Sequence, residues 1–128
     1  MSETQGVKDD AEKNQLDLLS ATWIEGVGKV LTFGARKYAA HNWRKGISRS
    51  RLLGAAFRHP FAYLRGEDCD AETGLLHLYH ASCCLMFAAE LHETRPDTDD
   101  RVRVILHKDQ TSLNGDKSID LYKRCGGE

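Results

Sequence analysis

Two histidines in the second half of the chain have a spacing that suits shared chemistry. His77 and His80 stand three positions apart in an apolar segment, and Thr73 and Cys84 fall on the same edge if that segment is helical. Residues three or four apart lie on one helix face, so both imidazoles can reach one metal ion or one substrate. The alternative is a pair of core histidines that hydrogen-bond to backbone, and the spacing leaves both interpretations open.

Four carboxylates precede these histidines within six residues: Glu67, Asp68, Asp70 and Glu72. Carboxylates at this density repel one another unless they are solvated or share a cation, and hard divalent ions such as Mg²⁺ bind carboxylate oxygens. The alternative is a solvated turn in which Asp70 caps the following helix. The spacing of Glu67 and Asp70 does not by itself decide between these interpretations.

Basic side chains lie upstream of this turn. Arg51, Arg58 and Arg65 recur on one edge of an expected helix, and Lys37 precedes them. Guanidinium groups match phosphate oxygens, although a solvated face is the commoner explanation for such a stripe. The cysteines lack the CxxC spacing of a structural zinc site, and the sequence has no P-loop and no other glycine-rich nucleotide motif.

Three segments with helical periodicity must position these residues. The expected helices span about 21–40, 49–66 and 71–93, with N-caps at Ser20, Ser48 and Asp70. Pro60 is expected to kink or split the second helix. The third is apolar nearly all round, which is typical of a central helix in a bundle.

The predicted fold class is therefore all-α, a bundle of three main helices plus a short C-terminal element. Alternating apolar residues near position 104 indicate that element. The expected organisation is a mobile polar lead (1–20), a helical catalytic domain (21–93) and a C-terminal extension (94–128). A chain of 128 residues buries a modest core, so association into an oligomer would help it.

Charge is segregated along the chain. Residues 21–65 hold nine bases against one acid, and residues 66–100 hold nine acids against one base. The blocks either attract each other as solvated helices or build a site that needs both signs. A whole-chain pI near 6.6 argues against a nucleic-acid partner. The sequence shows no signal peptide, no membrane-length apolar run and no disulfide framework, so we expect a cytoplasmic protein with no membrane contact.

Five short blocks in a fixed order resemble one family. They are LTFGARKY (31–38), NW (42–43), RH (58–59), GEDCDAETG (66–74) and HLYHA (77–81). The chain resembles the phage dATP/dGTP diphosphohydrolases, specifically their N-terminal domain, which are related to the MazG-like all-α nucleotide pyrophosphohydrolases. The resemblance covers about residues 8–93.

The resemblance implies a MazG-like bundle assembled as a homodimer or homotetramer. It implies metal-dependent hydrolysis of dGTP, and of dATP as a second substrate, to the monophosphate and pyrophosphate with Mg²⁺ or Mn²⁺ as cofactor. In some such phages this step supplies deoxyguanylate for 2-aminoadenine nucleotides. The rival hypothesis is a non-catalytic helical module that binds nucleotide or protein. A triphosphate-releasing HD-type enzyme is disfavoured, because the sequence has no contiguous His-Asp pair.

Site residues follow from the same resemblance. MazG-like enzymes carry paired carboxylates on two helices, whereas residues 55–59 of this chain contain none. We therefore expect either a rebuilt metal shell, made of His59, Glu67, Asp70, His77 and His80, or a metal displaced to the turn 67–72. Glu67 and Asp70 are also the expected catalytic residues. The expected substrate-binding residues are Lys13, Lys37, Asn42, Trp43 and Arg58. Trp43 would stack on the base, or else serve only to fold its loop.

Overall fold

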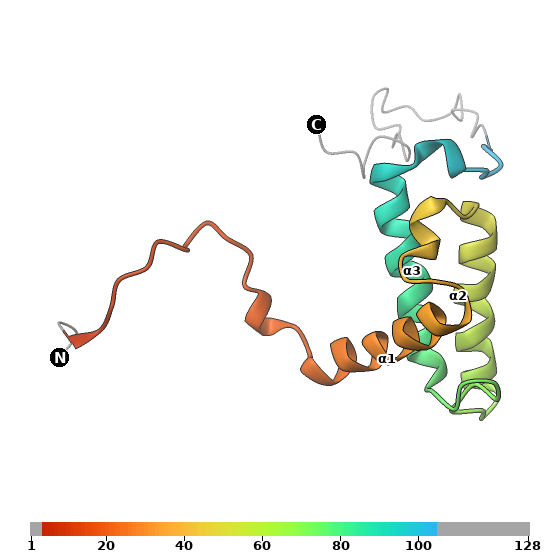
Figure 1. Ribbon diagram of the computed structural model, residues 1–128, viewed down its shortest axis with the longest axis horizontal. Helices are drawn as coiled ribbons and strands as arrows, with labels where there is room; N and C mark the ends of the chain where they lie inside the picture. The colour runs from red at the N-terminus through yellow and green to blue at the C-terminus, as the bar shows by residue number, and fades with distance from the viewer. Residues whose placement is uncertain (1–3, 105–128) are drawn as a thin grey trace, which may run out of the picture.

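The computed structural model describes residues 4–104, and within that range it is all-helical (Figure 1). The three α-helices are α1 (Ala21–Lys37), α2 (Arg49–Leu64) and α3 (His77–Thr94). Short 3-10 turns are η2 (Leu16–Leu18), η3 (Asn42–Lys45) and η4 (Pro96–Thr98). No β-strand occurs between residues 4 and 104, so the all-α prediction is confirmed there. The expected C-terminal element near position 104 is not formed up to the last described residue, because residues 101–104 have no regular secondary structure. The rest of that element, from residue 105, lies outside the described residues.

Helix α1 begins where the sequence predicts. The Ser20 hydroxyl accepts a hydrogen bond from the Trp23 backbone N–H at 3.1 Å, which satisfies one of the free donors of the first turn. The helix ends at Lys37, three residues earlier than expected. His41 then adopts a left-handed conformation with φ 63°, which breaks the helical path before η3.

Helix α2 continues through Pro60 without being split. Its N-terminus is capped from a distant part of the chain rather than by Ser48, whose side chain makes no capping bond. The Asp100 carboxylate instead accepts hydrogen bonds from the Ser50 N–H, at 2.8 Å, and from the Ser50 hydroxyl. A carboxylate at this position also suits the helix dipole, so the segment after α3 stabilises the start of α2.

Helix α3 starts at His77, and the prediction of a helix from residue 71 is wrong. Asp70 caps a tight turn instead of α3, because its Oδ2 accepts the N–H groups of Glu72 and Thr73. Gly74 follows with φ 71°, a left-handed conformation that ends the turn. The loop 65–76 folds back on itself, and the N–H of His77 donates to the carbonyl of Asp68 at 2.9 Å. The acidic loop therefore lies against the first turn of α3.

Helix α3 is central, as predicted, because it packs against both other helices. Figure 1 shows α2 and α3 side by side, with α1 crossing α3 near the end where the loop joins α2 to α3. Leu91 of α3 is fully buried with Trp43 and Leu52, while Cys83 packs with Val27 of α1. These two small clusters form the core.

Gly26 of α1 lies directly against the Tyr79 side chain of α3. A Cβ atom added there would stand 2.4 Å from the Tyr79 ring, whereas one added at Gly34 would meet nothing within 4 Å. Nearby, the Trp23 indole N–H donates to the Ser82 hydroxyl at 2.8 Å. Glycine at position 26 therefore sets how closely the two helices approach.

The polar lead extends away from the three helices (Figure 1). All its described residues, 4–20, are exposed, including the leucines of η2. None of the described helices combines the length and apolar character needed to cross a membrane.

Candidate functional site

Three histidines from two helices meet at the junction of α2, α3 and the acidic loop. His59 near the end of α2 places its Nδ1 2.8 Å from Nδ1 of His77 on the first turn of α3. The His59 ring also stacks on His80, with centroids 4.7 Å apart and planes inclined by 12°. The two histidines of α3 thus share His59 as a common neighbour.

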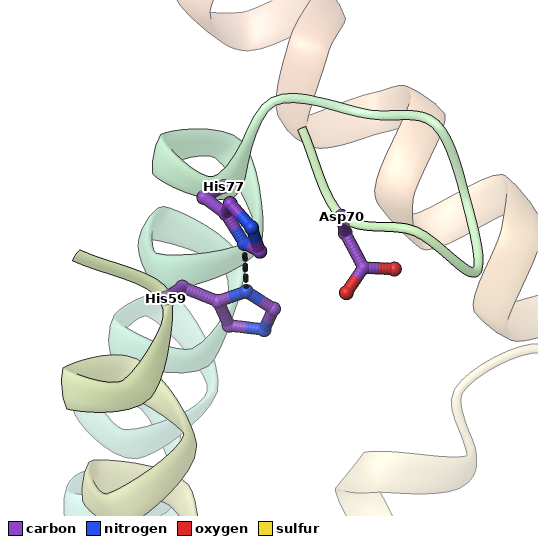
Figure 2. Close-up of side chains that lie close together, drawn as sticks. All are labelled: His59, Asp70 and His77. Carbon is purple, nitrogen blue, oxygen red and sulfur yellow. Dashed lines mark hydrogen bonds between the residues drawn. The ribbon is translucent and has the colours of Figure 1, made fainter. Parts of the chain in front are cut away.

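One carboxylate of the loop, Asp70, lies close to two of these histidines. We call His59, Asp70 and His77 the His–Asp cluster (Figure 2). One potential ligand atom from each of its members lies within 4.8 Å of the others. Glu67 and His80 flank the cluster. Glu67 Oε2 lies 3.2 Å from His77 Nε2, and His80 Nε2 lies 2.7 Å from the Thr73 hydroxyl. All five residues expected in a metal shell are therefore brought together.

The surroundings of His59, His80 and Asp70 shift their pKa values toward the charge states in which such side chains bind metal ions. Burial, and then the neighbouring His80 and His77 rings, lower the pKa of His59. Burial likewise lowers the pKa of His80, partly opposed by Asp70. Burial disfavours the ionised form of Asp70, but the hydrogen bonds from Thr73 and the nearby His80 lower its pKa on balance. The imidazoles of His59 and His80 are therefore neutral, and the carboxyl group of Asp70 is ionised, near pH 7.

The donor set fits a divalent metal ion. Two imidazole nitrogens and one carboxylate oxygen converge from α2, the loop and α3, with His77 buried and the other two half-buried. Imidazole suits transition ions, whereas Mg²⁺ prefers oxygen ligands and retains water. Among residues 4–104, no cysteine belongs to this donor set: Cys69 is exposed, and burial raises the pKa of the Cys83 thiol to about 12.

The His–Asp cluster adjoins a cavity of about 680 Å³ between α1, the segment 38–47 and one face of α3. This size is in the range of small-molecule sites. Polar side chains line the part of the cavity that adjoins the cluster, which we call its polar end, and apolar side chains line much of the remainder. The polar end includes His59, Asp70, Glu72, Thr73 and His80, and the apolar part includes Val30, Leu31, Phe33, Met86 and Phe87.

The expected substrate-binding residues are distributed unevenly around this cavity. Lys37 and Asn42 line it, and the Lys37 ammonium lies 2.7 Å from Glu72 at the polar end. Trp43 also borders it but is only 8% exposed and stacks on Phe87, with ring centroids 4.5 Å apart. This burial corresponds to the interpretation in which Trp43 folds its loop.

Two expected substrate-binding residues lie elsewhere. Arg58 lines a separate hollow beside Arg51 and Ala55 instead of the main cavity. It acts on the cluster only as a nearby positive charge, which contributes to the lowered pKa of His59. Lys13 lies in the exposed lead, which does not border the cavity.

Sequence reasoning missed three residues that border the cavity: His41, Arg44 and Glu90. Arg44 of η3 forms an ion pair with Glu90 of α3, and its Nε donates to His41 Nδ1 at 3.1 Å. The partners are 46 positions apart. One signal was available, because Glu90 falls one heptad after Cys83 on an otherwise apolar face.

Comparison with known proteins places this arrangement in a family. The family model described as "dATP/dGTP diphosphohydrolase, N-terminal" matches residues 3–101. The chain belongs to this family. A relative from Salmonella phage PMBT28, named "dATP/dGTP diphosphohydrolase", is 42% identical over 96 residues. That alignment covers 75% of this chain and 33% of the relative, so the chain spans about a third of the relative's length. No solved structure matches the chain.

The part matched by the N-terminal diphosphohydrolase family contains the whole site. It includes the three helices, the His–Asp cluster, the cavity and the Asp100 contact that caps α2. It ends at position 101, shortly before the last described residue.

Proposed function

We propose that this protein hydrolyses purine deoxynucleoside triphosphates, dGTP and dATP, to the deoxynucleoside monophosphate and pyrophosphate. One observation carries the proposal: the His–Asp cluster adjoins a cavity of about 680 Å³, which is large enough for a nucleotide. The activity named in the family description is consistent with it. The proposed role is the supply of deoxyguanylate for phage 2-aminoadenine nucleotide synthesis.

The cluster would hold a divalent cation through His59, Asp70 and His77. Such an ion, when bound, supplies positive charge to phosphate oxygens and lowers the pKa of a bound water. In the proposed reaction, water attacks the α-phosphorus, the bond to the bridging oxygen of the β-phosphate breaks, and pyrophosphate leaves. The protein's own contribution is to place its ligands before substrate arrives.

Glu67 and Asp70 keep distinct parts in this proposal. Asp70 faces the two histidines directly, held in place by the hydrogen bonds from Glu72 and Thr73. Glu67 acts through His77: its carboxylate accepts a hydrogen bond from Nε2, so the ring nitrogen that carries the lone pair is Nδ1, the atom that lies 2.8 Å from His59 Nδ1. Glu67 is thus a positioning residue for the ligand.

Lys37 and Asn42 are the proposed substrate contacts. Lys37 sits at the polar end, where its ammonium would move from Glu72 to a phosphate oxygen as substrate enters. Its pairing with Glu72 raises its pKa, so it stays protonated across the working pH range. Asn42 borders the same cavity from η3.

The decisive experiment is product analysis. The purified protein is incubated with each dNTP and NTP in Mg²⁺, Mn²⁺ or EDTA, and products are separated by anion-exchange chromatography. We expect deoxypurine monophosphate plus pyrophosphate, lost in EDTA. Nucleoside plus triphosphate would indicate a different hydrolase class. No turnover with any metal would favour the rival hypothesis of a binding module.

Variants link turnover to the cluster. Asp70→Asn and Glu67→Gln should each lower kcat at least 100-fold while the far-UV circular dichroism spectrum is unchanged. Asp68→Asn is the matched control in the same loop, because its exposed side chain is outside the cluster. Full activity in both Glu67→Gln and Asp70→Asn would overturn the site assignment.

A further inference from the structure

The cavity has a second polar end, formed by Arg44 and Glu90. Glu90 lies ten residues after His80 on α3, which is about 15 Å along the helix axis. Cys83 and Phe87 fall between them and line the same cavity. His80, which flanks the His–Asp cluster, and Glu90 therefore border the same mainly apolar cavity at positions about 15 Å apart along α3.

Arg44 is held in a defined orientation. Its Nε donates to His41 Nδ1, its Nη1 bonds Glu90 Oε2, and its guanidinium carbon lies 4.4 Å from the centre of the Trp43 ring. In the described part of the chain, Arg44 Nη2 and Glu90 Oε1 make no hydrogen bond. The pair therefore keeps one donor nitrogen and one acceptor oxygen unused, on two residues that line the cavity.

A donor beside a carboxylate complements the edge of guanine. Guanine presents the O6 acceptor next to the N1–H and N2–H₂ donors, so a guanidinium donates to O6 while a carboxylate accepts from adjacent N–H groups. Adenine presents one exocyclic amino group and an N1 acceptor at that edge. The carboxylate therefore has fewer donors to accept from when adenine is bound.

We propose that Arg44 and Glu90 read the Watson–Crick edge of the base and make the site prefer dGTP to dATP. This inference rests on the proposed function, because the phosphates must lie at the His–Asp cluster for the base to reach Glu90. The competing explanation is a surface ion pair that merely joins η3 to α3. Such half-exposed pairs contribute little to stability.

The test compares three substrates. In the wild type, kcat/KM should fall in the order dGTP, dITP, dATP, because dITP keeps O6 and N1–H but lacks the 2-amino group. Glu90→Gln should lower kcat/KM for dGTP about 10- to 100-fold and change dATP less than about 3-fold. Arg44→Met should act in the same direction. Glu93→Gln, an exposed carboxylate one turn further along α3, is the matched control and should change neither.

Equal losses for dGTP and dATP in Glu90→Gln would overturn the inference, since they would show a structural ion pair. Failure of the proposed function is separable from this outcome. If the wild type turns over no dNTP, calorimetric titration with dGTP and dATP in EDTA measures base preference directly. Selective weakening of dGTP binding in Glu90→Gln would then support base reading, and unchanged binding of both nucleotides would refute it.

Discussion

The Nδ1 atoms of His59 and His77 lie 2.8 Å apart although eighteen positions separate the two residues. One belongs to α2 and the other to α3, so any ion that binds both would join the two helices. The loop between them makes this contact possible by folding back and adding Asp70. The site therefore depends on how α2 packs against α3.

We expect divalent metal to stabilise the fold. An ion bound only by the folded state raises the unfolding free energy by about 2.7 kcal/mol at a hundred times its Kd. Thermal unfolding should shift upward with MnCl₂ relative to EDTA, and His59→Asn should remove most of the shift. His92→Asn, an exposed histidine in the last turn of α3, is the control. An equal shift in His59→Asn would place the ion elsewhere.

Stability without metal should fall as the medium becomes acidic. The pKa values of His59 and His80 lie below their ordinary value of 6.5 in the folded state. The unfolded chain therefore binds protons first, and the unfolding free energy decreases as pH falls below 6.5. Urea titrations in EDTA at pH 7.5, 6.5 and 5.5 measure this effect. His80→Gln should make the unfolding free energy depend less on pH. The same pH dependence in this variant as in the wild type would contradict the burial of His80.

Two glycines of α1 should respond oppositely to alanine. Gly26→Ala places a methyl group against the Tyr79 ring and should cost about 1–3 kcal/mol by overpacking. Gly28→Ala meets no atom within 4 Å and should stabilise the helix by up to about 1 kcal/mol. Equilibrium denaturation of both variants measures the change in unfolding free energy. Equal changes in the two variants would mean that α1 does not pack against α3 as described.

An exposed apolar face on α2 should mediate self-association. Phe57, Phe61 and Leu64 are 60%, 56% and 78% exposed, and their spacing places them on one side of the helix. We propose that this face supports the homodimer or homotetramer. Sedimentation velocity should show an oligomer for the wild type and a smaller species for Phe61→Arg. Lys29→Glu on α1, also exposed, controls for a change in charge. A monomeric wild type would refute the proposal.

The local sequence pattern predicts the three helices, but it predicts their ends less well. The Ser20 cap and the start of α2 at Arg49 agree with the sequence, because capping and apolar periodicity act within a few residues. Helix α3 starts at His77 and not at residue 71 as the pattern predicts, because the turn capped by Asp70 and the positive φ of Gly74 are incompatible with a helix there. The cap of α2 by Asp100 spans fifty positions, which no local pattern reveals.

The order of the amino acids is enough to identify the five metal-shell candidates, the helical segments and the family. Which of those groups face one another depends on how the helices pack. The tertiary structure set His59 against His77, packed Trp43 into the core, placed Arg58 outside the main cavity and paired Arg44 with Glu90. The physical reason is that helix formation is governed by near neighbours, whereas these contacts depend on the packing of α1 and α2 around α3.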